Sequence, residues 1–380
     1  MSEEYNHGVR VLEVKTGGRT LRTIATAIIG LVATGPAADA AMFPANQLVV
    51  INGGNIDAAI AAAGATGTLR GSLQAIANQA STFVIVGRAV QGAAPIDTVD
   101  KAVVAMIKQL RVAEALVGYK PRIIGAPGLD TEAVTTELAL TAAKLRGRAY
   151  ASCNGANTVA SILTYRAKFS ARELMLIAGD FTADSGAVTV NGVATALGLR
   201  AKIDQTIGWN KTISNVPVAA VTGIANPFFF DLQDSSTDVG ALNAAGVTCL
   251  VNFDGALRFW GSRTCSSDPD FVFESAVATA QVLADTCARG LAAYVDGPIT
   301  PSMARDAIEE INTFGRRLKT SGLLIDCKAY LPESNTAETL SAGGLRIGYR
   351  FTPTPPLEDL TLQQEITEEF LSDFAAQVAA

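Results

Sequence analysis

The side chains that could do chemistry in this chain lack the partners that catalysis requires. The sequence of 380 residues contains a single histidine, His7, close to its N-terminus. A hydroxyl nucleophile depends on a neighbouring base, usually histidine, to take its proton. The nucleophile elbow G-x-S-x-G, the phosphate loop G-x-x-x-x-G-K-[ST] and the zinc motif H-E-x-x-H are also missing. These absences predict that the chain is not an enzyme and that it holds no cofactor and no metal.

Cysteines and carboxylates are the remaining candidates for chemistry. The five cysteines are widely spaced and odd in number, so we interpret them as reduced core residues rather than disulfides or metal ligands. The acidic residues Asp180, Asp184 and Asp204 are scattered, and we expect them to be solvated or to cap helices. A soluble α/β enzyme with an unrecognised site of carboxylates or of Cys153 is the alternative hypothesis.

The composition suits a globular chain that also buries surface against copies of itself, although an Ala-rich α/β enzyme has a similar composition. Apolar residues make up 49% of the sequence, charged residues only 17%, and the net charge is −6. No basic block is present, which argues against nucleic acid as a partner. No apolar run could span a bilayer, and the N-terminus lacks the features of a signal peptide, so we expect no membrane insertion.

Strands and helices alternate through the first part of the chain. Continuous apolar runs are typical of buried strands and occur at residues 83–87, 122–126, 148–152 and 173–178. Amphipathic stretches between them predict helices at residues 98–116, 131–145 and 157–168. This alternation predicts an α/β domain with a doubly wound parallel sheet. Further along, we expect a helix at 187–209 and an extended connector at 217–230.

The stretch 246–286 has a strong local pattern. A β-branched run at 247–252, the turn pair Asp254-Gly255 and an extended run at 256–260 predict a hairpin. Asp268 is a good N-cap and Pro269 suits the first helical position, so a buried helix should follow directly.

The residues D-G-A-L-R-F-W-G-S-R-T-C-S-S-D-P at 254–269 resemble a signature near the start of the last domain of contractile tail sheath proteins. The likeness is closest to the sheaths of P2-like phages and R-type bacteriocins. It extends to H-G-V-R-V-L-E-V at 7–14 and to G-L-R-I-G-Y-R-F-T-P-T-P-P-L-E-D-L at 344–360. The resemblance implies a structural subunit that polymerises helically around a tail tube and contracts to drive the tube through the target cell envelope.

The resemblance also implies an architecture, partners and a location. It divides the chain into an N-terminal arm at 1–22, a subtilisin-like outer α/β domain at 23–240, an inner α+β domain at 241–356 and a C-terminal arm at 357–380. The implied partners are other sheath subunits, the tail tube protein, and baseplate and tail terminator proteins. The implied location is the virion tail or a bacteriocin particle, with the host bacterial cytoplasm during assembly.

The two arms differ in charge. Residues 5–22 contain four basic side chains against Glu13 alone, whereas residues 358–380 contain six acidic side chains and no Lys or Arg. A single strand is not stable without a partner strand. The N-terminal arm therefore either forms an edge strand of its own subunit's sheet or, as the resemblance favours, pairs with a sheet of a neighbouring subunit. The candidate inter-subunit strand residues are Val9, Val11, Val14, Leu360, Leu362 and Ile366.

A helix expected from Pro301 to Ser321 has a strongly basic end. Its apolar stripe consists of Ala307, Ile311, Phe314 and Leu318. The basic residues are Arg316, Arg317 and Lys319. Their charges could simply complement the helix dipole. Because a helix near this point faces the inner tube in sheath proteins, the resemblance makes these three residues the candidates for tube contact.

Overall fold

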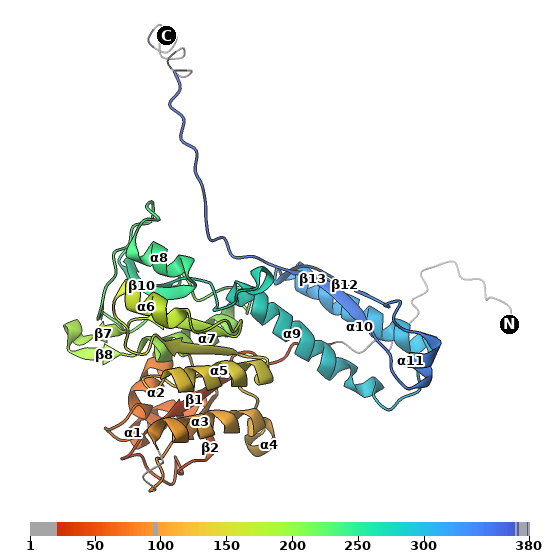
Figure 1. Cartoon of the computed structure of the whole chain (residues 1–380), viewed down its shortest axis with the longest axis horizontal. Coiled ribbons are helices and arrows are strands. Elements are labelled where there is room, and N and C mark those ends of the chain that lie inside the picture. The colour runs from red at the N-terminus through yellow and green to blue at the C-terminus, as the bar shows by residue number, and fades with distance from the viewer. Residues whose placement is uncertain (1–20, 94–97, 369–370, 372–377, 379–380) are drawn as a thin grey trace, which may run out of the picture.

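The computed structural model describes residues 21–93, 98–368, 371 and 378. A broad α/β part and a narrower elongated part lie side by side, and the end of the chain runs away from both (Figure 1). The inter-subunit candidates Val9, Val11 and Val14 and the single histidine, His7, lie outside the described residues.

The α/β part is built on an eight-stranded sheet that is parallel in its centre. Its six central strands pair in parallel, and the two edge strands pair antiparallel. The central strands have apolar residues on both faces, as covering by helices on both sides requires. In spatial order the strands are β11 (Ala256–Trp260), β10 (Val247–Phe253), β6 (Leu174–Ala178), β5 (Arg148–Ser152), β4 (Ile123–Gly125), β1 (Ile29–Ala33), β3 (Val84–Arg88) and β2 (Leu48–Ile51).

Helices cover both faces of this sheet, so the expected α/β fold with a large, mainly parallel sheet is confirmed. Alternate residues of β1 separate the two cores: Leu31 packs into one and Val32 into the other. The first face carries α1 (Ile56–Ala62), α2 (Leu69–Ala77) and α7 (Gly192–Thr206). The second face carries α3 (Val99–Gln109), α4 (Ala113–Val117), α5 (Glu132–Leu145), α6 (Val159–Arg166) and α8 (Asp238–Ala244).

A small three-stranded sheet replaces the start of the helix expected at 187–209. It consists of β8 (Val188–Val190), β7 (Phe181–Ala183) and β9 (Gly223–Ile224), in that order. The β-branched residues of β8 favour a strand, and Asn191 then starts α7 by accepting a hydrogen bond from the Ala194 N–H. The prediction was therefore wrong for residues 187–191, because a capping residue was taken for part of the helix.

The expected hairpin is present, but it belongs to the α/β part. Asp254 and Gly255 both have positive φ, as a tight two-residue turn between β10 and β11 requires. Because β10 pairs with β6, the hairpin extends the eight-stranded sheet, although it follows residue 240, where the inner domain was expected to begin. Asp268 caps only a single 3-10 turn, Pro269–Phe271, and the long helix α9 (Glu274–Leu291) starts after it.

The elongated part combines helices with a two-stranded sheet. Its core lies between α9, α10 (Pro301–Thr320) and the antiparallel pair β12 (Leu324–Tyr330) and β13 (Gly348–Pro353), with α11 (Ala337–Ser341) at the tip. Thr300 caps α10 by accepting a hydrogen bond from the Met303 N–H. At Gly315 an added Cβ would lie 2.8 Å from the Cβ of Cys327, so a glycine is needed where α10 crosses β12. The four stripe residues of α10 are all at most 2% exposed: Ala307, Ile311, Phe314 and Leu318.

Beyond β13 the described chain forms no further helix or strand up to residue 367, and it extends away from the body (Figure 1). Among the helices of residues 21–93 and 98–368, none is both long and apolar enough to cross a membrane.

Candidate assembly surfaces

The C-terminal arm exposes its apolar side chains. Leu360 is 67% exposed, Leu362 83% and Ile366 96%, although side chains of this type are normally buried. The backbone around them is extended and belongs to no sheet of the described chain. An extended apolar segment without a partner in its own subunit is suited to pair with another chain.

The base of this arm is fixed to the body. Arg263, which belongs to the sequence signature, forms a bidentate salt bridge with Glu358. Its Nη2 lies 2.7 Å from Oε2, and its Nε lies 2.9 Å from Oε1. Thr354 donates a hydrogen bond to the Gly322 carbonyl oxygen at 3.3 Å. The arm therefore leaves the subunit from a defined point.

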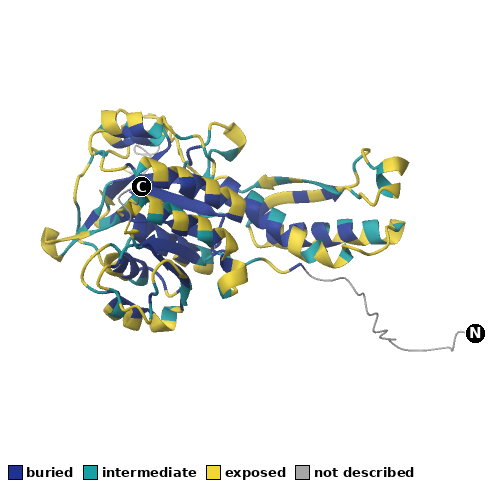
Figure 2. Ribbon diagram, turned by 60° about the horizontal axis from the view of Figure 1, so that its bottom comes forward, coloured by how far each residue is buried: buried dark blue, intermediate teal, exposed yellow. Residues whose placement is uncertain are grey.

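The sheet of the elongated part has two edges that pair with no other described strand. β12 and β13 pair only with each other among the described strands, so each has one edge without a backbone partner. Figure 2 shows buried residues on the side of this sheet that faces the helices and exposed residues on the opposite side. Such a pair of strands can accept an added strand at its edges, and at β12 the added strand would compete with Asn312 Oδ1, which accepts from the Ala329 N–H at 2.8 Å.

The three tube-contact candidates lie at the end of α10 and are exposed, but each has a partner within the subunit. Arg316 pairs with Glu309, and the Lys319 Nζ lies 2.9 Å from Asp326 Oδ2. Arg317 differs from both, because its Nη2 donates to the carbonyl oxygen of Leu21. Exposed ion pairs of this kind are worth little, so Arg316 and Lys319 can exchange their partners readily.

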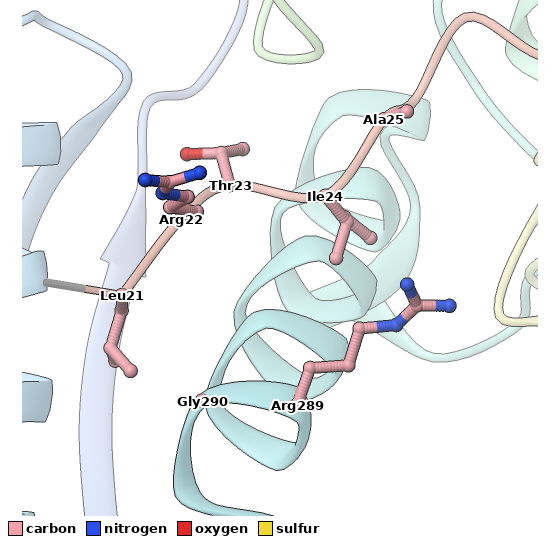
Figure 3. Close-up of a pocket in the computed structure, with 7 residues that line it drawn as sticks. All are labelled: Leu21, Arg22, Thr23, Ile24, Ala25, Arg289 and Gly290. Atoms are coloured by element: carbon pink, nitrogen blue, oxygen red, sulfur yellow. The ribbon is translucent and has the colours of Figure 1, made fainter. Parts of the chain in front are cut away.

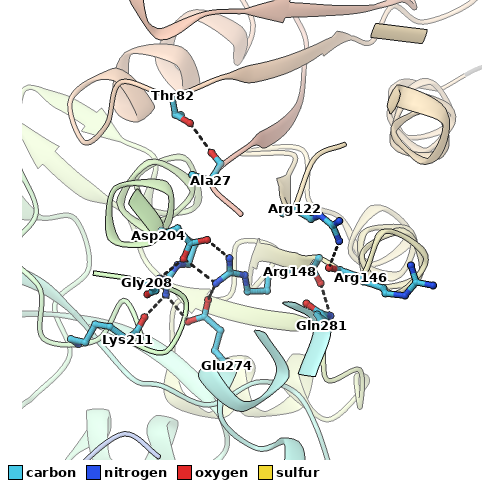
Figure 4. A network of polar contacts seen from close by, with 12 residues as sticks. Ala27, Thr82, Arg122, Arg146, Arg148, Asp204, Gly208, Lys211, Glu274 and Gln281 are labelled. Atoms are coloured by element: carbon cyan, nitrogen blue, oxygen red, sulfur yellow. Dashed lines mark hydrogen bonds and ion pairs between the residues drawn. The ribbon is translucent and has the colours of Figure 1, made fainter. Parts of the chain in front are cut away.

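A buried ion network joins the two parts of the molecule (Figure 4). Asp204 of α7 pairs with Arg148 of β5 and, at 2.6 Å, with Arg200 one turn earlier in α7. Glu274, at the start of α9, lies 3.5 Å from Arg148 and 3.6 Å from Arg200, and it accepts a hydrogen bond from the Tyr150 hydroxyl. Two guanidinium groups thus face two carboxylates, and the network has no net charge when all four are ionised.

Burial and pairing with arginine have opposite effects on the pKa of Asp204. Burial alone would raise the pKa of Asp204, but Arg148 and then Arg200 hold it below its usual value. Burial raises the pKa of Tyr150 well above its usual value, and the neighbouring Glu274 raises it further. Asp204 was expected to be solvated or capping, and this was wrong: its side chain is 0% exposed.

A second buried pairing lies further along α9. Asp285 contacts Arg122 and lies 3.2 Å from Lys120 and 2.6 Å from Arg146, all three from the α/β part. Between the two sites, Gln281 donates to the Gly147 carbonyl oxygen at 3.1 Å. Burial alone would raise the pKa of Asp285, but Arg122 and Lys120 lower it.

These contacts lie on one face of a single helix. Glu274, Gln281 and Asp285 are spaced by seven and then four residues, a spacing that places them on the same side of α9. The polar face of α9 therefore joins the elongated part to the sheet, while its apolar face packs against α10. The sequence signal for this junction was the i,i+4 pair Arg200 and Asp204 in α7, where Lys202 is the one other charged residue.

The residues considered for an enzyme site do not form one. Cys153 is buried, and this burial raises the pKa of its thiol. Its neighbour Ser152 donates its backbone N–H to Asp130, whose pKa is raised by burial, but the chain's single histidine is not among the described residues. Within the described ranges, no three His, Cys, Asp or Glu side chains are arranged to hold a metal ion.

Comparison with known proteins identifies the family. The family model "Phage tail sheath protein central domain" matches residues 102–265, and "Phage tail sheath C-terminal domain" matches residues 266–367. The tail sheath protein of Escherichia phage P2 is 46% identical over 99% of both chains. The chain belongs to the phage tail sheath protein family. The major tail sheath protein of Serratia phage KSP20 is 39% identical, with 97% of each chain covered.

Solved sheath structures share the fold at much lower identity. The contracted sheath of the extracellular contractile injection system PVC superimposes with a TM-score of 0.74 at 14% identity, covering 97% of this chain and 99% of the PVC chain. The contracted helical sheath of the anti-feeding prophage has the same TM-score at 16% identity, covering 95% and 99%. The tail sheath family consists of structural proteins, so membership confirms the prediction that this chain is not an enzyme.

We expect broad peptidase and esterase screens of the purified sheath protein to give no turnover above buffer. Ser152 has no imidazole base among the described residues, and Cys153 is buried and protonated at neutral pH. Activity that disappears on Ser152→Ala or Cys153→Ser, but persists in Ser161→Ala, would contradict this expectation.

Proposed function

We propose that this chain is the repeating subunit of a contractile sheath that polymerises helically around a tail tube and contracts to drive the tube through the target envelope. The observation that carries the proposal is the exposed apolar C-terminal arm, combined with the edges of β12 and β13 that pair with no other described strand. A strand donated to one neighbour and an edge offered to another make a contact between different surfaces. Contacts of this type that do not close produce an open helical polymer.

The arms are proposed to link the subunits by strand addition. Leu360, Leu362 and Ile366 would pair with an edge of the β12–β13 sheet in a neighbour, where main-chain hydrogen bonds supply most of the affinity. The remaining edge would take the strand around Val9, Val11 and Val14 from another subunit. The basic N-terminal arm and the acidic C-terminal arm would then attract each other across the shared sheet.

The two parts of the subunit are proposed to face in opposite directions in the polymer. The α/β part, which the resemblance likens to subtilisin, would lie outside, and the α9–β13 part would lie inside, next to the tube. We place the division between them at residue 265, after the β10–β11 hairpin, where the two family models also meet. The proposed partners are the tube, baseplate and tail terminator proteins, and the proposed location is the virion tail after assembly in the bacterial cytoplasm.

The buried network supports a rigid-body mechanism of contraction. Glu274 and Asp285 attach α9 to the α/β part through paired buried charges, which are costly to separate. Each subunit would therefore move as one body, while the extended arms bend between bodies and keep the lattice connected.

Negative-stain electron microscopy of the purified protein tests the proposal. Long tubes of uniform width are expected, because every subunit carries both a donor arm and an acceptor edge. A compact closed oligomer would contradict the proposal and favour the alternative of an enzyme.

The exposed basic residues at the end of α10 give a separate test. The double variant Arg316→Glu, Lys319→Glu should fold normally, because both side chains are exposed and weakly paired. It should, however, fail to assemble in the extended state on its tube, because acidic residues would replace the proposed tube contacts. Arg305→Glu reverses a charge at the far end of the same helix and should assemble normally. Extended tails formed by the double variant would contradict the tube-facing assignment.

A further inference from the structure

The first described residue, Leu21, is fixed in the elongated part rather than in the sheet. Its side chain is 3% exposed and belongs to the core that also contains Leu283 and Phe314. Its position depends on a glycine of α9: a Cβ added at Gly290 would lie only 1.9 Å from the Leu21 Cδ2. Figure 3 shows Gly290 beside the chain segment that begins at Leu21. The small residue thus makes room for the leucine side chain against the helix.

The backbone of Leu21 is held from the opposite side by α10. The Arg317 guanidinium donates from Nη2 to the Leu21 carbonyl oxygen. The same guanidinium lies over the Phe314 ring, with its Cζ 5.2 Å from the ring centroid, and this contact limits the positions it can adopt. Leu21 is therefore secured by its side chain on α9 and by its carbonyl group on α10.

The segment that follows Leu21 packs against the same core through Ile24 and is hydrogen-bonded to the α/β part near its far end. Residues 22–25 lie beside a groove of about 580 Å³, lined by residues 21–25 with Arg289 and Gly290 (Figure 3). At the far end, the Thr82 hydroxyl donates to the Ala27 carbonyl oxygen at 2.6 Å, and the Arg122 N–H donates to the Ile28 carbonyl oxygen at 2.9 Å. The segment thus bridges the two parts of the subunit.

We propose that Leu21, Gly290 and Arg317 form an anchor that fixes where the N-terminal arm leaves the subunit. The proposal rests on the function proposed above, in which that arm reaches a neighbour. Tension applied to the arm would then act on α9 and α10, which pack against the acceptor sheet. This tension would not be transmitted to β1 through the segment 22–28. Arg317 is in this case a positioning residue for the arm, and the tube-contact role is left to Arg316 and Lys319.

Tryptic cleavage after Arg22 in dispersed subunits tests the anchor without any polymer. A protease needs several residues around its cleavage site in extended form, so Leu21 must leave its place before cleavage. Arg317→Ala removes a charge-assisted hydrogen bond and should speed this cleavage about tenfold, with Arg317→Lys in between. Gly290→Ala should also speed it, because the new methyl group displaces Leu21.

The control for Arg317→Ala is a second arginine of α10, Arg305. Arg305→Ala removes an exposed arginine of α10 whose Nε donates to the Pro301 carbonyl oxygen at 3.2 Å, and its cleavage rate should equal that of the unmodified chain. Intact-mass measurement separates cleavage after Arg22 from cleavage elsewhere. Equal rates for Arg317→Ala, Gly290→Ala and the control would overturn the anchor.

Assembly without tube protein separates the anchor from tube contact. Arg317→Ala should reduce the number and length of tubes that the purified sheath protein forms alone, because its arm leaves from a variable position. Arg316→Ala should form them normally. Unaltered tubes from Arg317→Ala would overturn the anchor's role in assembly. If the unmodified protein formed no tubes, the proposed function would fail, while the cleavage rates would still decide whether the anchor exists.

Discussion

Deletion of residues 358–380 should leave the subunit folded and abolish its polymerisation. The exposed side chains of Leu360, Leu362 and Ile366 contribute almost nothing to the core of their own subunit. The deletion removes the contacts of Glu358 with Arg263 and with the Ser262 hydroxyl, and the Arg263–Glu358 pair is partly exposed. The unfolding midpoint should therefore change by no more than about 2 °C. Circular dichroism, thermal unfolding and electron microscopy of the same preparation would measure both effects.

The matched control for this deletion is Glu358→Gln, which weakens the contact with Arg263 but keeps the apolar arm. It should form tubes. Replacing Leu360, Leu362 and Ile366 with asparagine keeps the length of the arm, and this variant should fail to polymerise like the deletion. Long tubes from the truncated protein, or its loss of cooperative unfolding, would contradict strand exchange as the link between subunits.

Asp204→Asn should destabilise the subunit more than any surface change. The substitution leaves Arg148 and Arg200 buried and facing Glu274 alone. Breaking a buried ion pair by removing one partner costs about 3–5 kcal/mol, because the remaining charge is uncompensated. Denaturant unfolding would measure this loss. Asp326→Asn removes the exposed partner of Lys319 and should leave the free energy of unfolding almost unchanged. A loss of similar size in both variants would contradict the role of the network.

This network and the buried pairing of Asp285 predict an acid limit to stability. The folded-state pKa of Asp204 and of Asp285 lies below the ordinary 3.8, so both carboxylates stabilise the fold above that pH. This contribution is lost as pH falls from about 4 through the folded-state values, because the unfolded chain then binds more protons. The free energy of unfolding should fall in that range, and it should fall less steeply in Asp204→Asn. Identical pH dependence in the two proteins would contradict this prediction.

The sequence predicted those elements whose signals are local. Asp254-Gly255 specifies a hairpin by turn chemistry, and the stripe from Ala307 to Leu318 specifies one face of a helix by its period. The parallel sheet followed from strands that are apolar on both faces. Each of these patterns depends only on residues that are near one another in the chain.

The features that the sequence did not reveal depend on contacts between distant residues. In the sequence, Asp204 has the features of a surface carboxylate. Its partner Arg148 is 56 positions earlier in the chain, and only the fold brings β5 next to α7. The sequence alone does not distinguish Arg317 from Arg316. The fold does, because it places the Leu21 carbonyl oxygen next to the Arg317 guanidinium. The β10–β11 hairpin has the same local pattern in either domain, and only its pairing with β6 assigns it to the larger sheet.

The burial of all five cysteines makes this protein well suited to site-specific probes. Burial raises the pKa of the Cys249, Cys265 and Cys287 thiols to about 12, so at neutral pH they are almost entirely protonated and inaccessible to maleimides. A cysteine introduced at exposed Gln363, on the opposite face of the proposed strand from Leu362, would therefore be the preferred site for a dye, with no need to replace the native thiols. Energy transfer between labelled arms would then report the change in subunit spacing during contraction, in solution and in real time.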